Sequence, residues 1–498
     1  MTENKSYVQL ADHMKELKLI ESSLGILYWD MKTYMPPKGI QQRAEILALF
    51  SKIHHERLVS NFTKTKLKEL NNASDLTDVR KRNLELWQRG YDMESKLPAD
   101  LVQKLAKQQN ITEKLWEKAK SKSNFKLIQS EIEKLFDLVK QKANAYDPDK
   151  PMYDVLLDLF EKNTTQAMIN EYFSTLKVGV LKIIEKCEGS SIKPDVNSIK
   201  IKTTIEQQKQ LSKFIMDFIG MDTERSRIDE TEHPFTTGYA DDVRITTHYL
   251  EDDPMASFYA VLHEGGHGLY DMNMPIEHRW TAIGDGASHG IHESQSRFVE
   301  NMIGKSPEFL THALPIIQDI IPEYNKINTN DFIRAVNVVI PSKIRVYADE
   351  VTYNLHIIMR YEMERDLFFE KISISELPQV WEEKMDTYFG LKLNNEAEGV
   401  LQDVHWYGGG FGYFPAYALG NVYDGALLNA MELSIPDWKQ QLKEGNGKNI
   451  LEWLDVNVHK KGFLYDPVDL IENVTGNKPD AAAFIDYLND KFRNIYDF

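Results

Sequence analysis

The sequence of 498 residues has a single cysteine, Cys187, and no long apolar run. One cysteine excludes an intramolecular disulfide, and a chain of this size without one is typical of a reducing compartment. No stretch approaches the roughly 18 consecutive apolar residues of a membrane span, and the N-terminal segment lacks the apolar run of a signal peptide. We therefore expect a cytoplasmic protein without a membrane partner, in which Cys187 is a small core residue.

Glycine and proline are also scarce, with 26 and 18 residues, so the chain has few turn signals and long helices are expected. Basic residues are outnumbered, because 59 Lys and Arg face 76 Asp and Glu, which gives a net charge of −17. No basic run or patch interrupts this acidic background. Nucleic acid is therefore not expected as a partner, since phosphate binding needs a Lys and Arg footprint.

Helical patterns dominate what is present. Charged, nearly glycine-free sequence over about residues 74–146 predicts a helical hairpin, Asp78–Ser95 and Ala99–Lys120, and a third helix from about Asn124. The one strand-like stretch is Asp242–Tyr249, where apolar and polar residues alternate. Without internal repeats or a linker, the whole chain is expected to form one large, mainly α unit with a small sheet.

One motif carries metal chemistry. His263, Glu264 and His267 form an H-E-x-x-H pattern, and histidines four residues apart share one face of a helix. With Cβ atoms about 5–6 Å apart, both imidazoles can reach one zinc ion at about 2.0–2.1 Å. Glu264 could then take a proton from water on the metal, which lowers the pKa of that water toward roughly 7. An accidental match of five letters is the alternative.

Two glycines, Gly265 and Gly266, stand inside this predicted helix. Each costs the helix roughly 1 kcal/mol relative to alanine. Their presence predicts that another backbone approaches closely here, with simple tight helix packing as the alternative.

A catalytic zinc needs a third protein ligand and an open fourth position. The extended metzincin pattern is absent, because Tyr270 and Asn273 stand where it requires Gly and His. A second helix predicted over Ile291–Met302 favours Glu293, near its start, as the third ligand. The other downstream candidates are Glu277, His278, Asp285, His289 and His292; the last two are the main rivals, and His292 could instead support a ligand or pack.

Five motifs follow one another along the chain: DVRIT at Asp242–Thr246, HEGGH at His263–His267, HESQ at His292–Gln295, IRVYAD at Ile344–Asp349 and GVLQDVHW at Gly399–Trp406. Three more elements accompany them: YWDMKTYMPPKG at Tyr28–Gly39, HPF at His233–Phe235 and GYFPAYALGN at Gly412–Asn421. With these motifs the sequence resembles the carboxypeptidase Taq family of zinc metallocarboxypeptidases over essentially its whole length.

The resemblance implies an exopeptidase that removes single residues from peptide C-termini, with broad specificity and poor cleavage next to proline. It assigns the zinc ligands to His263, His267 and Glu293 and the general base to Glu264, with Co²⁺ as an alternative metal. It also implies an almost all-helical fold with a long narrow groove, as in neurolysin-like and angiotensin-converting-enzyme-like peptidases, which residues 74–146 are expected to flank. Homodimers are usual in the family.

Peptide hydrolysis also needs hydrogen-bond donors for the oxyanion. His405, Tyr413 and Tyr417 are the candidates, because the stretch YGGGFGYFPAY resembles the glycine-and-tyrosine loop of related zinc peptidases. A flexible loop with packed aromatic side chains is the alternative.

An exopeptidase must recognise the free C-terminal carboxylate, which a guanidinium does through two parallel hydrogen bonds. Arg345 is the leading candidate, in a predicted helix where Asp349 at i+4 could orient it; a plain surface ion pair is the alternative. Arg244 is expected either to contact substrate or to pair with the neighbouring Asp242. The segment Asp242–Thr247 could align an extended peptide as an edge strand. His233, in the HPF element, is a further substrate-binding candidate through the resemblance.

Two other functions remain open at the level of sequence. An endopeptidase or oligopeptidase on the same zinc scaffold would need no carboxylate anchor, so Arg345 separates it from an exopeptidase. A non-enzymatic, helical peptide-binding protein would have a structural metal site or none. Glu264 disfavours this last function, since structural zinc has no need of a carboxylate at that position and favours closed sites rich in cysteine.

Overall fold

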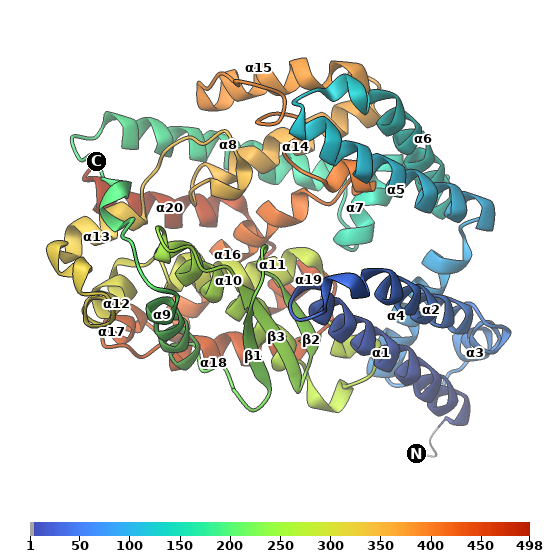
Figure 1. The fold of residues 1–498 in the computed structure, drawn as a ribbon. Coiled ribbons are helices and arrows are strands. Elements are labelled where there is room, and N and C mark those ends of the chain that lie inside the picture. The colour runs from blue at the N-terminus through green and yellow to red at the C-terminus, as the bar shows by residue number, and fades with distance from the viewer. Residues whose placement is uncertain (1–3) are drawn as a thin grey trace.

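The structure, a computed structural model, describes residues 4–498, and these are mainly helical (Figure 1). In chain order the first ten α-helices are α1 (Lys5–Lys32), α2 (Ile40–Leu58), α3 (Asn61–Asn71), α4 (Asp78–Ser95), α5 (Ala99–Ser121), α6 (Gln129–Tyr146), α7 (Met152–Phe160), α8 (Gln166–Gly189), α9 (Ile205–Phe218) and α10 (Pro254–Met272). The others are α11 (His289–Arg297), α12 (Pro307–Ile320), α13 (Thr329–Val336), α14 (Tyr353–Phe368), α15 (Leu377–Phe389), α16 (Pro415–Ser434), α17 (Trp438–Lys443), α18 (Lys448–Asn457), α19 (Pro467–Thr475) and α20 (Ala481–Tyr496).

The mainly α fold expected from the sequence is confirmed, and so are the three helices expected after Thr77. The Thr77 side chain caps α4 by accepting from the Arg80 backbone N–H, and Pro98 starts α5, where a missing N–H costs nothing. The third helix, α6, begins at Gln129 after a single 3₁₀ turn, Phe125–Leu127. That residues 1–498 form one domain stays a prediction.

A three-stranded sheet lies against α10, which carries the H-E-x-x-H pattern. Its strands are β1 (Ser226–Glu230), β2 (Thr236–Tyr239) and β3 (Asp242–Thr247), in the order β1-β3-β2. β1 pairs parallel with β3, and β2 pairs antiparallel with it. β3 is therefore the central strand, and the expectation that it offers a free edge is wrong. Both sides of β3 are hydrogen-bonded to a neighbouring strand. The edges of the sheet are therefore β1 and β2, and β2 is the edge strand that contacts α10.

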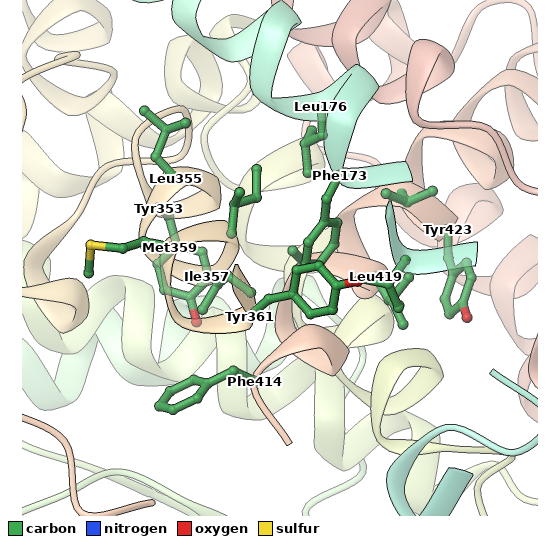
Figure 2. Packing of buried hydrophobic residues seen from close by; sticks show 14 of the residues in the cluster. Phe173, Leu176, Tyr353, Leu355, Ile357, Met359, Tyr361, Phe414, Leu419 and Tyr423 are labelled. Carbon is green, nitrogen blue, oxygen red and sulfur yellow. The ribbon is translucent and has the colours of Figure 1, made fainter. Parts of the chain in front are cut away.

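The largest apolar cluster fills the space between α8, α14 and α16 (Figure 2). Phe173 and Leu176 of α8 meet Tyr361 of α14 and Leu419 of α16 there, all at most 2% exposed. Burying side chains of this size stabilises the fold by roughly 1.5–3 kcal/mol each. α14 and α16 are thus fixed in the interior, and they position the segments that follow them.

Helices α1–α4 have a smaller core of their own and lie together at one end of the molecule (blue, Figure 1). Leu10, Met14, Leu67 and Trp87 are among its buried members. Among the described residues outside these helices and their connections, Ala282 is the only apolar residue packed against this core. Aromatic contacts also join this unit to the rest of the chain, for example Tyr28 edge-on against Phe235.

Two expectations from composition concern the environment of Cys187 and the presence of membrane-spanning helices. Cys187 is buried in the large cluster, and burial raises its pKa to about 12, so it is a core thiol as expected. None of the helices within residues 4–498 combines the length and the apolar character that crossing a membrane requires.

Candidate active site

Two helices bring the candidate metal ligands together. His263, Glu264 and His267 lie on α10, and Glu293 lies on α11, which packs between α10 and α16. The approach depends on glycine: a Cβ on Gly266 would lie 2.6 Å from the backbone oxygen of Gln295. On the other side, a Cβ on Gly420 of α16 would lie 3.0 Å from the Ser294 backbone nitrogen. The close backbone approach expected at the Gly265–Gly266 pair is therefore present at Gly266.

The three candidate ligands fit a single metal ion. Glu293 Oε2 lies 3.8 Å from His263 Nε2 and 3.6 Å from His267 Nε2, and the three ligand atoms lie within 4.8 Å of one another. Two ligands at 2.0–2.1 Å from a tetrahedral zinc are separated by about 3.3 Å. The residues present thus match a two-histidine, one-carboxylate site with small adjustments. No other group of this kind occurs among residues 4–498.

The first histidine is oriented by a carboxylate behind it. His263 Nδ1 lies 2.9 Å from Glu300 Oε2, and Lys305 Nζ lies 2.6 Å from the other oxygen of Glu300. Glu300 belongs to a π-helical segment, Phe298–Ile303, that continues α11, so the helix predicted over Ile291–Met302 starts earlier and changes type. A carboxylate at Nδ1 keeps the proton on that nitrogen and leaves Nε2 free for a metal.

The second histidine is held through another histidine. His267 Nδ1 and His292 Nδ1 are 2.6 Å apart, and His292 Nε2 lies 2.9 Å from Asp271 Oδ1. We assign the protons so that His267 Nδ1 donates to His292, which in turn donates from Nε2 to Asp271, because this leaves His267 Nε2 free. His292 therefore lies behind the site rather than in the ligand group. His289, the other rival, packs edge-on against Phe160 and Tyr413.

Glu293 is fixed by its own helix. Arg297 Nε donates to Glu293 Oε1 at 2.7 Å, one turn further along α11, which leaves Oε2 facing the two histidines. Burial raises the pKa of Glu293, but the charge of Arg297 and the contacts with His263 and His267 outweigh it and hold the pKa well below the usual value. Glu293 is therefore a carboxylate, the form that binds a metal, at every ordinary assay pH.

Glu264 faces the same cavity and is held by a residue of β2. The Thr236 hydroxyl of β2 lies 2.7 Å from Glu264 Oε2 and 2.9 Å from the Glu264 backbone oxygen. The cavity, of about 300 Å³, is lined by Phe235 and Thr236 and also by Tyr413 and Tyr417. The edge strand β2 thus forms one wall of the site.

The candidate oxyanion donors His405, Tyr413 and Tyr417 lie close together. His405, in a 3₁₀ helix (His405–Gly408), stacks on Tyr413 at 5.4 Å, and its Nε2 lies 3.4 Å from the Tyr417 hydroxyl. His405 is behind the two tyrosines and is not part of the cavity lining. Burial lowers the pKa of His405 to about 4, so the imidazole is neutral and can accept a hydrogen bond from Tyr417. Gly412, with φ +88°, lets this loop pass Leu156 closely.

Arg345 differs from its expected surroundings. It lies in a single 3₁₀ turn, Arg345–Tyr347, and not in the predicted helix, because α14 begins only at Tyr353. Asp349 does not orient it; that side chain accepts from the backbone N–H groups of Val351 and Thr352. Asp403 is the partner instead, 3.1 Å from Arg345 Nε and 2.9 Å from Nη2. The guanidinium lies 5.2 Å from the ring centre of Tyr417, behind the cavity wall.

The two remaining candidates lie away from the cavity lining. Arg244 makes the ion pair with Asp242, at 2.8 and 2.9 Å, and its guanidinium lies 4.1 Å from a ring centre of Trp29. This arrangement favours the structural alternative for Arg244. His233 is exposed, just before β2.

Comparisons with known proteins show which family the chain belongs to. A sequence model described as carboxypeptidase Taq (M32) metallopeptidase matches residues 9–492. The chain belongs to this family. It is 37% identical to Carboxypeptidase 1 of Bacillus subtilis (strain 168) over 97% of both chains, and 34% identical to Thermostable carboxypeptidase 1 of Thermus thermophilus over the full length of both. The crystal structure of an M32 carboxypeptidase from Deinococcus radiodurans R1 superposes with a TM-score of 0.97 at 29% identity, covering 99% of this chain and 100% of that one.

Sequence reasoning missed several residues of this M32 site. Glu300 and Arg297 lie seven and four residues after Glu293, so helical spacing placed them on its face and could have suggested them. Asp403 is 58 residues from Arg345, and Thr236 is 28 residues from Glu264. Nothing in one sequence links pairs at such separations. The family motifs contained Asp403, but they did not say what it contacts.

Proposed function

We propose that this metallocarboxypeptidase is a zinc enzyme in which His263, His267 and Glu293 bind the metal and Glu264 is the general base. The observation that carries the proposal is the convergence of three ligand atoms within 4.8 Å beside a cavity that Glu264 also faces. Zinc suits a site of two imidazoles and one carboxylate, and Co²⁺ is the alternative metal. When bound there, it would polarise the scissile carbonyl and acidify a water molecule.

Glu264 has the position for two proton transfers. As general base it takes the proton of the attacking water, and as general acid it passes that proton to the nitrogen of the leaving amino acid. The Thr236 hydroxyl, 2.7 Å from Oε2, holds the carboxylate toward the cavity. Tyr413 and Tyr417, which also line the cavity, would donate hydrogen bonds to the oxyanion that develops on the substrate, Tyr417 by turning its single O–H away from His405.

Exopeptidase action requires a group that recognises the free C-terminal carboxylate, and we assign this to Arg345. Its guanidinium lies 5.2 Å from the ring centre of Tyr417, outside the cavity lining, and the residue is 8% exposed. A substrate whose last residue lies between the metal and Arg345 would be cut one residue from its end. Broad side-chain specificity, poor cleavage next to proline and a homodimeric assembly stay predictions from the family resemblance.

The test compares a short peptide as free acid and as C-terminal amide. Metal-loaded protein, chelated protein and Glu264→Gln are assayed side by side for release of the last residue, with metal content measured in each. We expect release from the acid alone, lost on chelation and lost in Glu264→Gln although that variant keeps its metal. Equal internal cleavage of both peptides would indicate an endopeptidase and remove the role given to Arg345. A Glu264→Gln variant with full activity would contradict the assignment of the base.

A further inference from the structure

Helix α14 has an unusual polar stripe. His356, Arg360 and Glu364 follow one another at intervals of four residues, so they share one face, and each is completely buried. A buried charge is costly unless it is paired and hydrogen-bonded. The partners of these side chains therefore indicate what the stripe does.

Arg360 is joined to Arg345 through two neighbouring residues. Its Nε donates to Asp403 Oδ2 at 2.7 Å, and its Nη2 donates to Gln402 Oε1 at 2.8 Å. The other oxygen of Asp403 accepts from Arg345, and Gln402 Oε1 also accepts from the Arg345 backbone N–H at 3.0 Å. Gln402 and Asp403 thus bridge two arginines that lie on different segments.

The charges of this network do not cancel. Two guanidinium groups share one carboxylate, which leaves one positive charge. Burial lowers the pKa of both His356 and His405, so neither adds charge at neutral pH. Glu364, one turn beyond Arg360, binds uncharged donors: Trp406 Nε1, the Tyr153 hydroxyl and the Gly412 N–H. Burial raises its pKa to about 7, so it offsets the excess only in part.

We propose that Arg360 is a positioning residue for recognition of the substrate carboxylate. By binding one oxygen of Asp403, it prevents Asp403 from neutralising Arg345, and the remaining positive charge attracts the C-terminal carboxylate beside Tyr417. Arg360 itself is completely buried and does not touch the substrate. This inference rests on the proposed role of Arg345.

The test is the preference for a free-acid peptide over its amide. In Arg360→Gln, both oxygens of Asp403 become available to Arg345. We expect KM for the acid to rise about tenfold while kcat stays within about twofold, and the amide to remain uncleaved. Arg360→Lys keeps the charge and should retain most of the preference. Arg365→Gln, on the same helix but paired with Asp366, is the matched control and should behave like the wild type.

A double variant separates charge from packing. In Arg360→Gln/Asp403→Asn the positive charge on Arg345 is no longer opposed, so the acid preference should return toward the wild-type value. A merely structural role predicts that the double variant is worse than the single one. Should Arg360→Gln fail to fold, the double variant, which loses both members of a buried pair, decides alone: retained preference supports the proposal, and lost preference overturns it.

Binding without turnover gives a second readout. In the metal-loaded Glu264→Gln background, calorimetry with both peptides should show weaker binding of the acid when Arg360→Gln is added. A wild-type protein that treats acid and amide alike would overturn the role of Arg345 and, with it, this inference. A wild type that prefers the acid, together with an Arg360→Gln variant that keeps the preference, would overturn only the inference about Arg360.

Discussion

Glu300 illustrates how a single side chain can act on a metal site without binding the metal. Its Oε2 lies 2.9 Å from His263 Nδ1 and fixes the ring so that Nε2 faces Glu293. We expect Glu300→Gln to lower zinc affinity by about 10–100-fold, because an amide orients the imidazole less well than a carboxylate. Competition with a chromophoric chelator measures the affinity. Glu323→Gln, at an exposed position, is the control, and equal affinities in both variants would contradict the prediction.

A second prediction concerns how the stability of the protein depends on pH, and it rests on Glu161. Its carboxyl group is buried against the start of α11, where the Ser288 hydroxyl and the Gly290 N–H lie 2.9 Å away. Burial raises its pKa from 4.5 to about 7, so between these values the folded state holds a proton that the unfolded state has lost. Its contribution to the free energy of unfolding is therefore complete below pH 4.5 and is lost as the pH rises through 7.

We therefore expect the stability of the wild type relative to Glu161→Gln to fall between pH 5 and pH 8, by up to about 3 kcal/mol. Urea unfolding at several pH values measures this difference, and the comparison with glutamine removes the effect of all other titrating groups. Curves that run parallel across this range would contradict a raised pKa of Glu161.

For single residues, the sequence was informative where helix geometry fixes the spacing of the side chains. The two histidines of the H-E-x-x-H pattern and Glu293 do converge, since helix geometry dictates the first pair and only a few candidates existed for the third. The partner of Arg345 was predicted wrongly. Asp349 had the right spacing for a helix, but it accepts from the Val351 and Thr352 N–H groups instead, and the true partner, Asp403, depends on tertiary packing.

Among the elements, the contact between α10 and α11 tests the packing argument most directly. A Cβ on Gly266 would lie 2.6 Å from the Gln295 backbone oxygen, whereas one on Gly265 would meet the flexible end of Ile219. Gly266→Ala should therefore push the two helices apart, destabilise the protein by about 1–3 kcal/mol and weaken metal binding. Gly265→Ala is the matched control, because the Ile219 side chain can move away and better helix propensity offsets the remaining cost. Similar unfolding midpoints for the two variants would contradict this interpretation.

Element types were predictable from the sequence where the pattern was long. The helices α4, α5 and α6 appear where caps and apolar spacing predicted them. β1 and β2 were missed, because five and four residues are too few to show alternation, and both strands are hydrogen-bonded to β3. The order of the three strands, which makes β3 central, also could not be derived from local pattern.

At the scale of the whole molecule, the main feature is the way in which α1–α4 are attached to the rest of the chain. Their apolar core is separate, and ion pairs join them to the rest: Lys18 with Asp285 at 2.6 Å, and Arg82 with Asp466 at 2.6 Å. Asp466 also binds Lys162 at 2.7 Å. Residues of both parts, among them Lys18, Asp271 and Asp285, line one cavity.

We expect Asp466→Asn to loosen this attachment without unfolding the protein. Amide hydrogen exchange, followed by mass spectrometry, should become faster in α1 and α4, while exchange in α14 and α16 stays as in the wild type. Asp469→Asn, an exposed position on α19, is the control. Unchanged exchange in α1 and α4 would show that Asp466 does not hold the two parts together.

The buried state of Cys187 makes such motion measurable. Its thiol is 3% exposed and its pKa is raised to about 12, so it reacts poorly with thiol-directed reagents at neutral pH. Cysteines introduced on the surface, for example at Lys81 of α4 and at Lys439 of α17, would then be the only sites that take up spin labels or fluorophores. Distance measurements between two such labels could follow the approach of α1–α4 to the rest of the molecule during turnover, with the natural cysteine left in place.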